Sequence, residues 1–268
     1  MSKLGRRVIV AIILIPLLVL AVWYDEPISW LTLVVACWGG LAVTEFYKMA
    51  AKSGTQPLTI LGLVATLSLI ISPHFEIEKS TGLILALTAA VSFSWLVLRH
   101  SNYSGFASWA WTMGGILYVG LLLSLLVELR NFEYGREWVL LALLTTFASD
   151  SAAYLIGRSF GRHRLAPHIS PKKTWEGAVS GIIFAAIVSP LLVAILDLPT
   201  SIFAAILLGI IISGFGQLGD LSESLIKRST GTKDSGNTIP GHGGFLDRID
   251  SIVFAALVVY CFVIWFID

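Results

Sequence analysis

Long apolar runs, separated by short polar segments, dominate the chain. A helix needs roughly 17–25 apolar residues to cross about 30 Å of hydrocarbon. Nine runs approach or reach that length, at residues 7–23, 28–47, 58–73, 81–98, 107–128, 138–157, 175–196, 201–219 and 249–267. Because lipid offers the backbone no hydrogen-bond partner, such runs are expected to be helical. The pattern predicts an all-α fold: a polytopic membrane bundle of about nine transmembrane helices.

Two of the runs leave alternatives open. The first has a basic lead-in like that of a signal peptide, but Trp-Tyr-Asp-Glu-Pro follows it at 23–27 instead of a small-residue cleavage site. We interpret it as a retained span. The third run is short and ends at Pro73, so a tilted, interfacial or re-entrant segment is an alternative there.

Lysine and arginine are distributed unevenly over the connections between the runs. If all nine runs cross, fifteen basic residues fall on one side and Lys79, Arg130 and Arg136 on the other. Basic residues concentrate in cytoplasmic connections. The distribution therefore predicts a multi-pass protein with the N-terminus cytoplasmic and the C-terminus on the outer side.

Composition supports a single membrane domain. The 268 residues are 56% hydrophobic and 13% charged, with a mean hydropathy of +0.83, outside the usual range of soluble domains. A net charge of +1 gives no reason to expect a nucleic-acid partner; membrane lipids are the expected surroundings. We divide the domain into N-terminal scaffold helices, 1–135, and a C-terminal catalytic region, 136–268, with cytoplasmic loops 158–174 and 220–248.

Two carboxylates lie inside or beside apolar runs, where an ionised group is costly. Glu45 is close to the end of the second run and to Lys48, so we expect it to reach water at the interface. Asp150 lies well inside the sixth run and needs a partner. Either a structural salt bridge or a polar cavity or cation site would provide one.

The connection at 158–174 ends in Ser170-Pro171-Lys172-Lys173-Thr174-Trp175-Glu176-Gly177. Basic residues beside a span commonly serve only orientation and attraction to anionic headgroups. Two adjacent lysines at the start of a helix are also able to hold phosphates, because ammonium groups and helix N-termini both favour anions.

The segment before the last run contains the densest polar chemistry. Asp220, Glu223, Ser224 and Lys227 share one helical face. A stretch rich in glycine and other turn formers follows, and then Asp247 and Asp250 one helical turn apart. Carboxylates on two helices joined by a Lys- and Gly-rich loop suit a magnesium ion that carries nucleotide phosphates.

Residues 224–250 resemble the signature of the phosphatidate cytidylyltransferases, or CDP-diacylglycerol synthases, of bacterial type. The match runs Ser-x-Ile-Lys-Arg, four residues, Lys-Asp-x-Gly, two residues, Ile-Pro-x-His-Gly-Gly-Phe-x-Asp-Arg-Ile-Asp. The 170–177 segment and the span of Asp150 are also similar to the family. The resemblance implies that CTP and phosphatidic acid react to CDP-diacylglycerol and pyrophosphate in phospholipid biosynthesis. It further implies a magnesium requirement and a homodimer in the inner (cytoplasmic) membrane.

With this resemblance, we assign site residues. The expected metal ligands are Asp220 and Asp247, with Asp150 and Asp250 as further ligands or supporting groups, and a second cation beside Mg²⁺ is possible. The catalytic set comprises Asp220, Asp247, Asp250, Lys227 and His242. The expected phosphate-binding residues are Ser170, Lys172, Lys173, Arg228, Lys233, Arg248, Gly243 and Gly244. A phosphate monoester is already largely dianionic near neutral pH, so His242 suits loop ordering or phosphate contact better than a general base.

Three other functions share some of these features. A CTP-dependent polyprenol kinase would share the magnesium, the nucleotide loop and a membrane substrate. A CDP-alcohol phosphatidyltransferase is disfavoured because its Asp-Gly-x-x-Ala-Arg element is absent. A transporter would use Asp150 and Glu45 as cation-coupling groups, but the polar residues concentrate near one surface instead of the midplane.

Overall fold

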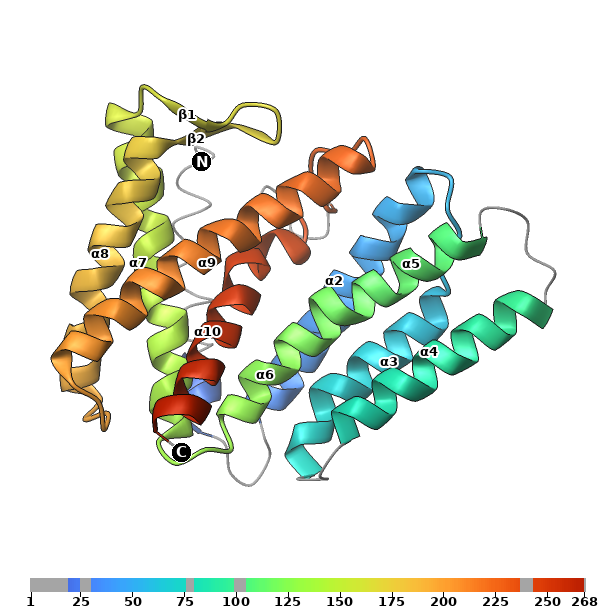
Figure 1. Cartoon of the computed structure of the whole chain (residues 1–268), viewed down its shortest axis with the longest axis horizontal. Coiled ribbons are helices and arrows are strands. Elements are labelled where there is room, and N and C mark those ends of the chain that lie inside the picture. Colours follow the sequence, from blue (N-terminus) through green and yellow to red (C-terminus); the bar gives the residue numbers. More distant parts are fainter. Residues whose placement is uncertain (1–18, 25–29, 76–79, 99–104, 237–242, 268) are drawn as a thin grey trace. The chain divides into compact units, whose positions relative to one another are not determined.

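The computed structural model describes residues 19–24, 30–75, 80–98, 105–236 and 243–267, and these are almost wholly helical (Figure 1). The elements are α2 (Trp30–Lys52), α3 (Thr59–Ile71), the 3-10 turn η1 (Ser72–Phe75), α4 (Ser80–Leu98), α5 (Gly105–Gly115), the π-helical η2 (Ile116–Leu121), α6 (Leu122–Leu129), α7 (Gly135–Phe160), β1 (Arg164–Ala166), β2 (Ser170–Thr174), α8 (Trp175–Ile195), α9 (Ile202–Ser229), the 3-10 turn η3 (Leu246–Arg248) and α10 (Asp250–Phe266).

Six helices in the described part of the chain are long and apolar enough to cross a membrane: Trp30–Lys52, Ser80–Leu98, Gly105–Leu129, Gly135–Phe160, Trp175–Ile195 and Ile202–Ser229. Two shorter apolar helices, Thr59–Phe75 and Asp250–Phe266, match the third and ninth predicted runs. Of the first run, 7–23, only residues 19–23 are described, and they are helical. The predicted all-α membrane fold is confirmed.

The chain forms two compact units. Unit 1 comprises residues 1–131 and 229–247, and unit 2 comprises residues 132–228 and 248–268. The first boundary lies near the division expected at 135. The segment 229–247, however, belongs to the unit of the N-terminal helices, although the sequence suggested that it belongs with the C-terminal region.

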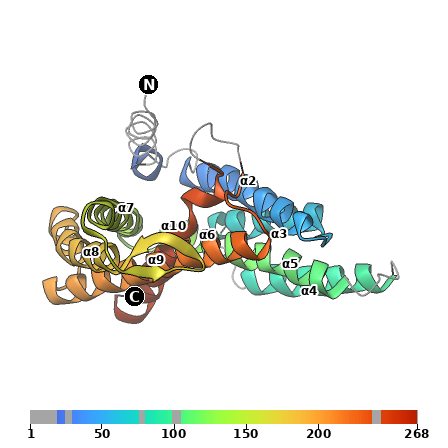
Figure 2. The same ribbon diagram turned by 90° about the horizontal axis from the view of Figure 1, so that it is seen from above.

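In unit 1, α3 packs against α2, α4 and the α5–η2–α6 helix (Figure 2). Tyr47 of α2 is 1% exposed, and its hydroxyl donates to the Thr112 carbonyl oxygen at 2.9 Å. A Cβ added at Gly62 or Gly115 would overlap the tyrosine ring. Small residues thus let these helices approach closely, as is usual where lipid provides no hydrophobic driving force.

In unit 2, α7 and α8 lie side by side (Figures 1 and 2). Polar contacts hold α9 to this pair: the Ser149 and Ser213 hydroxyl oxygens lie 2.7 Å apart, and Gln217 Nε2 donates to the Ala178 carbonyl oxygen at 3.1 Å. Such interhelical hydrogen bonds are typical of membrane bundles.

Both predicted loops are more regular than expected. Within 158–174, α7 continues to Phe160, and β1 and β2 form an antiparallel hairpin that pairs Arg164 with Thr174. In 220–248, the first ten residues belong to α9, which ends at Ser229. The last helix begins at Asp250, after a 3-10 turn that contains Asp247.

Candidate active site

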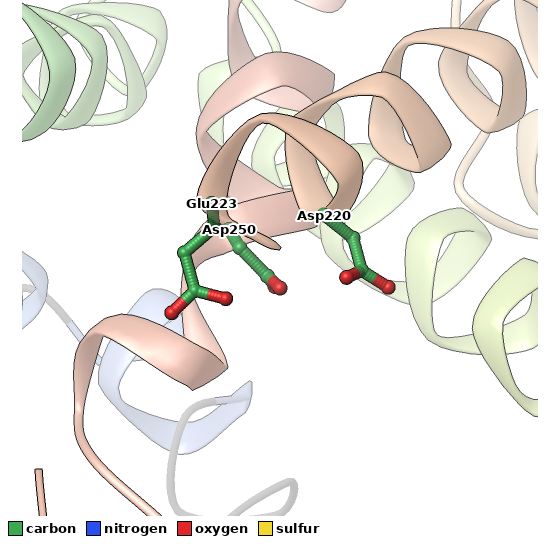
Figure 3. Close-up of side chains that lie close together, drawn as sticks. All are labelled: Asp220, Glu223 and Asp250. Carbon is green, nitrogen blue, oxygen red and sulfur yellow. The ribbon is translucent and has the colours of Figure 1, made fainter. Parts of the chain in front are cut away.

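Three carboxylates meet in unit 2, from two helices. Asp220 and Glu223 lie one turn apart on α9, and Asp250 is the first residue of α10 (Figure 3). One oxygen from each lies within 4.8 Å of the others. Glu223 is fully buried, whereas Asp220 and Asp250 are partly exposed. Hard oxygen ligands at this spacing are able to hold a divalent cation.

Glycine makes the meeting of the two helices possible. A Cβ added at Gly219 would overlap the backbone oxygen of Asp250 and would lie 3.0 Å from Cδ2 of Phe254. The residue after this glycine is Asp220. The close approach of α9 to the start of α10 therefore brings Asp220 beside Asp250.

Two lysines balance the cluster. Lys173 Nζ of β2 lies 2.8 Å from Asp220 Oδ2, with the two side chains 22% and 37% exposed. Lys227 Nζ pairs with Glu223 Oε2 one turn along α9, and that lysine is only 13% exposed. Because a buried charge without a partner is unfavourable, these ion pairs help to hold Asp220 and Glu223 in place.

Asp150 of α7 belongs to the same polar region. Its carboxylate accepts a hydrogen bond from the Ser251 side chain and lies within electrostatic reach of Asp220 and Lys173. The residue is exposed. Of the two interpretations left open by the sequence, a polar site near the predicted metal ligands agrees better with these contacts than an isolated interhelical salt bridge.

The basic hairpin is fixed to the helices of unit 2 at both ends. Thr174 is the N-cap of α8, and its hydroxyl accepts a hydrogen bond from the Gly177 amide at 3.2 Å. The Glu176 carboxylate accepts from the Arg162 amide at 3.1 Å and lies 2.6 Å from His163 Nδ1. Arg228 Nε of α9 donates to the Ile169 carbonyl oxygen at 3.1 Å. The hairpin thereby holds Lys173 over α9.

The other residues predicted to bind phosphate are distributed over both units. Unit 2 contains Ser170, Lys172, Arg228 and Arg248, of which Ser170 is partly exposed and the rest are exposed. Unit 1 contains Lys233, Gly243 and Gly244. Gly243 has a φ of +84°, a conformation that favours glycine. His242 lies outside the described residues.

Asp247 belongs to unit 1, where its carboxylate organises the signature segment. Asp247 Oδ2 accepts hydrogen bonds from the Gly244 amide at 2.8 Å, the Ser235 hydroxyl at 2.9 Å and the Ser235 amide at 3.3 Å. The structure thus brings Asp220 together with Glu223 and Asp250 within unit 2. Asp247 as a metal ligand stays a prediction.

The expectation for Glu45 was wrong. Instead of reaching water, the side chain is buried, with 4% of the residue exposed. Its Oε2 accepts hydrogen bonds from the Ser235 hydroxyl at 3.1 Å and the Leu246 amide at 3.0 Å. Ser235 and Leu246 thus provide the hydrogen bonds that water would give to an interfacial carboxylate.

Glu223 was not among the site residues predicted from the sequence, although it belongs to the polar helical face that the sequence shows. Asp220, Glu223 and Lys227 share one face of α9. The available signal was that Glu223 lies on this face between two residues already assigned to the site.

The fold and the clusters define an integral membrane protein with an acidic and basic polar site assembled from its helices. The chain belongs to the cytidylyltransferase family, whose model matches residues 5–266. It is therefore a nucleotidyltransferase. It is 31% identical to the phosphatidate cytidylyltransferase of Bacillus subtilis, over 85% of this chain and 87% of that one. It is 38% identical to that of Staphylococcus epidermidis, over 80% and 83%. The chloroplastic phosphatidate cytidylyltransferase 4 of Arabidopsis thaliana is 36% identical, over 80% of this chain and 60% of that one.

Proposed function

We propose that this protein is a magnesium-dependent phosphatidate cytidylyltransferase. It transfers the cytidylyl group of CTP to phosphatidic acid and releases pyrophosphate, giving CDP-diacylglycerol for phospholipid biosynthesis. The observation that supports this most directly is the carboxylate cluster of Asp220, Glu223 and Asp250 with its lysines. It occurs in a chain whose relatives carry the name of this activity.

The cluster suits a magnesium ion by its ligand chemistry and by its charge. Oxygen ligands of carboxylates are those that Mg²⁺ uses, together with water and phosphate oxygens. With Asp150, four acidic side chains lie near two lysines, Lys173 and Lys227, so acidic groups outnumber basic ones. When bound, Mg²⁺ would neutralise phosphate charge and polarise the phosphorus that is attacked.

The reaction requires two polyanions to approach each other. An oxygen of the lipid phosphate attacks the α-phosphorus of CTP, the bond to the bridging oxygen breaks, and pyrophosphate departs. A phosphate monoester with a second pKa of about 6 is mostly dianionic at neutral pH, so no strong base is needed. The main task of the protein is to position the groups and stabilise the developing charge.

The residues of unit 2 suit that task. Lys173 and Lys227 lie within the cluster, and Lys172 and Arg228 are exposed beside it on β2 and α9. We assign the exposed cations to the phosphates of the substrates and the paired lysines to the charge balance of the cluster. Ser170, Lys233, Arg248, Gly243 and Gly244 remain proposed phosphate contacts, and His242 a proposed ordering residue.

For the membrane arrangement, we propose nine spans with the N-terminus in the cytoplasm and the C-terminus outside. The bias of basic residues in the sequence supports this orientation. CTP is soluble and phosphatidic acid is held in the leaflet, so a site on the cytoplasmic side of the inner membrane would meet both. A homodimer is the proposed assembly, on the resemblance of the sequence to its family.

Purified protein in detergent, given labelled CTP, Mg²⁺ and phosphatidic acid, tests the function. We expect labelled CDP-diacylglycerol in equal amount to pyrophosphate, and no product after chelation of the metal. A parallel reaction with a polyprenol separates the alternatives. Phosphorylation of the polyprenol without reaction of phosphatidic acid would overturn the proposed substrate, and no nucleotide-dependent lipid product in either reaction would overturn the proposed activity.

A further inference from the structure

We propose that Glu45 of α2 is a positioning residue of the reaction, which holds residues 235–236 and 243–247 of the signature and orients Asp247 through the hydroxyl of Ser235. The inference rests on the proposed function in one respect: Asp247 has a role in catalysis only if that function holds. The N-terminal helices would then do more than form a scaffold.

The contacts form a continuous network within unit 1. Glu45 Oε2 accepts hydrogen bonds from the Ser235 hydroxyl at 3.1 Å and from the Leu246 amide at 3.0 Å. The same Ser235 oxygen lies 2.9 Å from Asp247 Oδ2. One hydroxyl therefore lies between the two carboxylates, which share its single proton. Leu246, which Glu45 binds directly, is the neighbour of Asp247 in the chain.

The glycines of the segment fit the same interpretation. A Cβ at Gly236 would lie 2.5 Å from Glu45 Oε1, and one at Gly244 would overlap both Ser235 Oγ and Glu45 Oε2. A Cβ at Gly243 would lie 2.6 Å from Asp247 Oδ2. The backbone thus approaches the two carboxylates so closely at these positions that a side chain would not fit. These glycines are needed for the network whether or not they also bind phosphate.

A second contact on the same helix supports the docking of the segment. The rings of Trp38 and Phe245 meet edge to face, with centroids 6.1 Å apart. Trp38 precedes Glu45 by seven residues, or two helical turns, so both lie on one face of α2. An aromatic contact and a buried carboxylate on this face bind two consecutive residues, Phe245 and Leu246.

A buried carboxylate has a higher free-energy cost than an apolar side chain of similar size. Burying an ionised group is unfavourable unless hydrogen bonds compensate for lost water, and an apolar side chain would pack against the segment at lower cost. What Glu45 adds is direction, because its oxygen accepts only from donors that point toward it. Directional contacts of this kind fix the orientation of a reacting group, and a misplacement of about 1 Å can slow a reaction about 100-fold.

The test uses the full-length protein in detergent and three substitutions. Glu45→Ala removes the hydrogen bonds to Ser235 and Leu246, Glu45→Gln retains an acceptor oxygen, and Ser235→Ala removes the hydroxyl between the carboxylates. Thr44→Ala is the matched control, because the Thr44 hydroxyl donates to the Leu41 carbonyl oxygen within α2.

The first measurement is amide hydrogen exchange without substrates. Glu45→Ala is expected to speed amide exchange about tenfold or more in peptides that cover 243–247. The Leu246 amide loses its acceptor, Glu45. The Gly244 amide keeps its acceptor, Asp247, but that carboxylate is no longer held in place. Peptides of α3 and α4 should exchange as in the unaltered protein. Unchanged exchange at 243–247, or equal acceleration throughout unit 1, would overturn the proposal.

The second measurement is the steady-state rate. We expect Glu45→Ala to lower kcat about 10- to 100-fold with little change in KM for phosphatidic acid, as for a lost transition-state alignment. Glu45→Gln should recover part of the loss. The double variant Glu45→Ala/Ser235→Ala should lose no more activity than the less active of the two single variants, because both residues act through one network. A normal kcat in Glu45→Ala contradicts the inference. If the unaltered protein forms no CDP-lipid, only the proposed function is contradicted, because the exchange measurement needs no substrates.

Discussion

Lys173 and Asp220 form an ion pair of 2.8 Å that joins the β1–β2 hairpin to α9. The two residues are 47 positions apart in the sequence. Lys173 comes from the polar segment 158–174 and Asp220 from the polar segment 220–248. The pair brings the basic segment around Lys173 and the acidic face of α9 together, which supports our proposal that both belong to one site.

Replacement of Lys173 by alanine is therefore expected to impair catalysis more than replacement of its neighbour. Loss of one preorganised charge at a transition state costs roughly 100- to 1,000-fold in kcat, and we expect a loss in that range for Lys173→Ala. Successive residues of a strand point to opposite faces, so Lys172→Ala is the matched control and should have a smaller effect, mainly on KM for CTP. Steady-state kinetics of both variants decide this; equal losses would remove the special role of Lys173.

A second prediction concerns the contact of α9 with α10. Gly219→Ala places a methyl group against the Asp250 backbone and should separate the helices that bring Asp220 and Asp250 together. Overpacking of this kind typically destabilises by about 1–3 kcal/mol, and we expect at least a tenfold loss of activity from a misplacement below 1 Å. Gly214→Ala on the same helix is the control, because nothing lies within 4 Å of its added Cβ. Thermal unfolding and activity should change for the first variant and hardly for the second.

The membrane fold could be predicted from the sequence because a span in lipid must be apolar and must satisfy its own backbone hydrogen bonds. Every run that crosses must be apolar and helical, so eight of the nine predicted runs correspond to helices of the described residues. The hairpin of Arg164–Ala166 with Ser170–Thr174 was not predicted, since a short basic strand pair has no hydrophobic alternation to reveal it.

The site was predictable only in part. The helical spacing of Asp220, Glu223 and Lys227 indicated a shared face, but the approach of Asp250 depends on how α9 packs at Gly219, which is a tertiary contact. Glu45 illustrates the same limit. A carboxylate at the end of a span usually reaches water, and only the fold of a segment 190 positions away buries it.

A third prediction separates stability from catalysis at the buried pair of Glu223 and Lys227. Glu223→Gln leaves the Lys227 ammonium in a site where only 13% of its side chain is exposed. Removal of one partner of a buried ion pair costs about 3–5 kcal/mol, so both the melting temperature and the activity should fall.

The double variant Glu223→Gln/Lys227→Met provides the control for that experiment. Methionine has a similar length and no charge, so the buried ammonium that lost its Glu223 partner disappears and much of the thermal stability should return. Activity should stay low, because the cluster has lost a carboxylate and a cation. Recovery of both properties in the double variant would show that the pair serves stability alone.

The last prediction concerns the metal. If Asp220 and Asp250 hold Mg²⁺, Asp220→Asn should raise the magnesium concentration for half-maximal activity, since a charged ligand is lost. Asp247→Asn should abolish turnover while the protein still folds and inserts, because Asp247 is the second predicted ligand and the acceptor of the Gly244 amide. Magnesium titrations of both variants, with thermal unfolding to verify the fold, measure the effects. Asp247→Asn with retained activity and an ordinary magnesium requirement would remove Asp247 from the metal site and leave it as the residue that orders the signature segment.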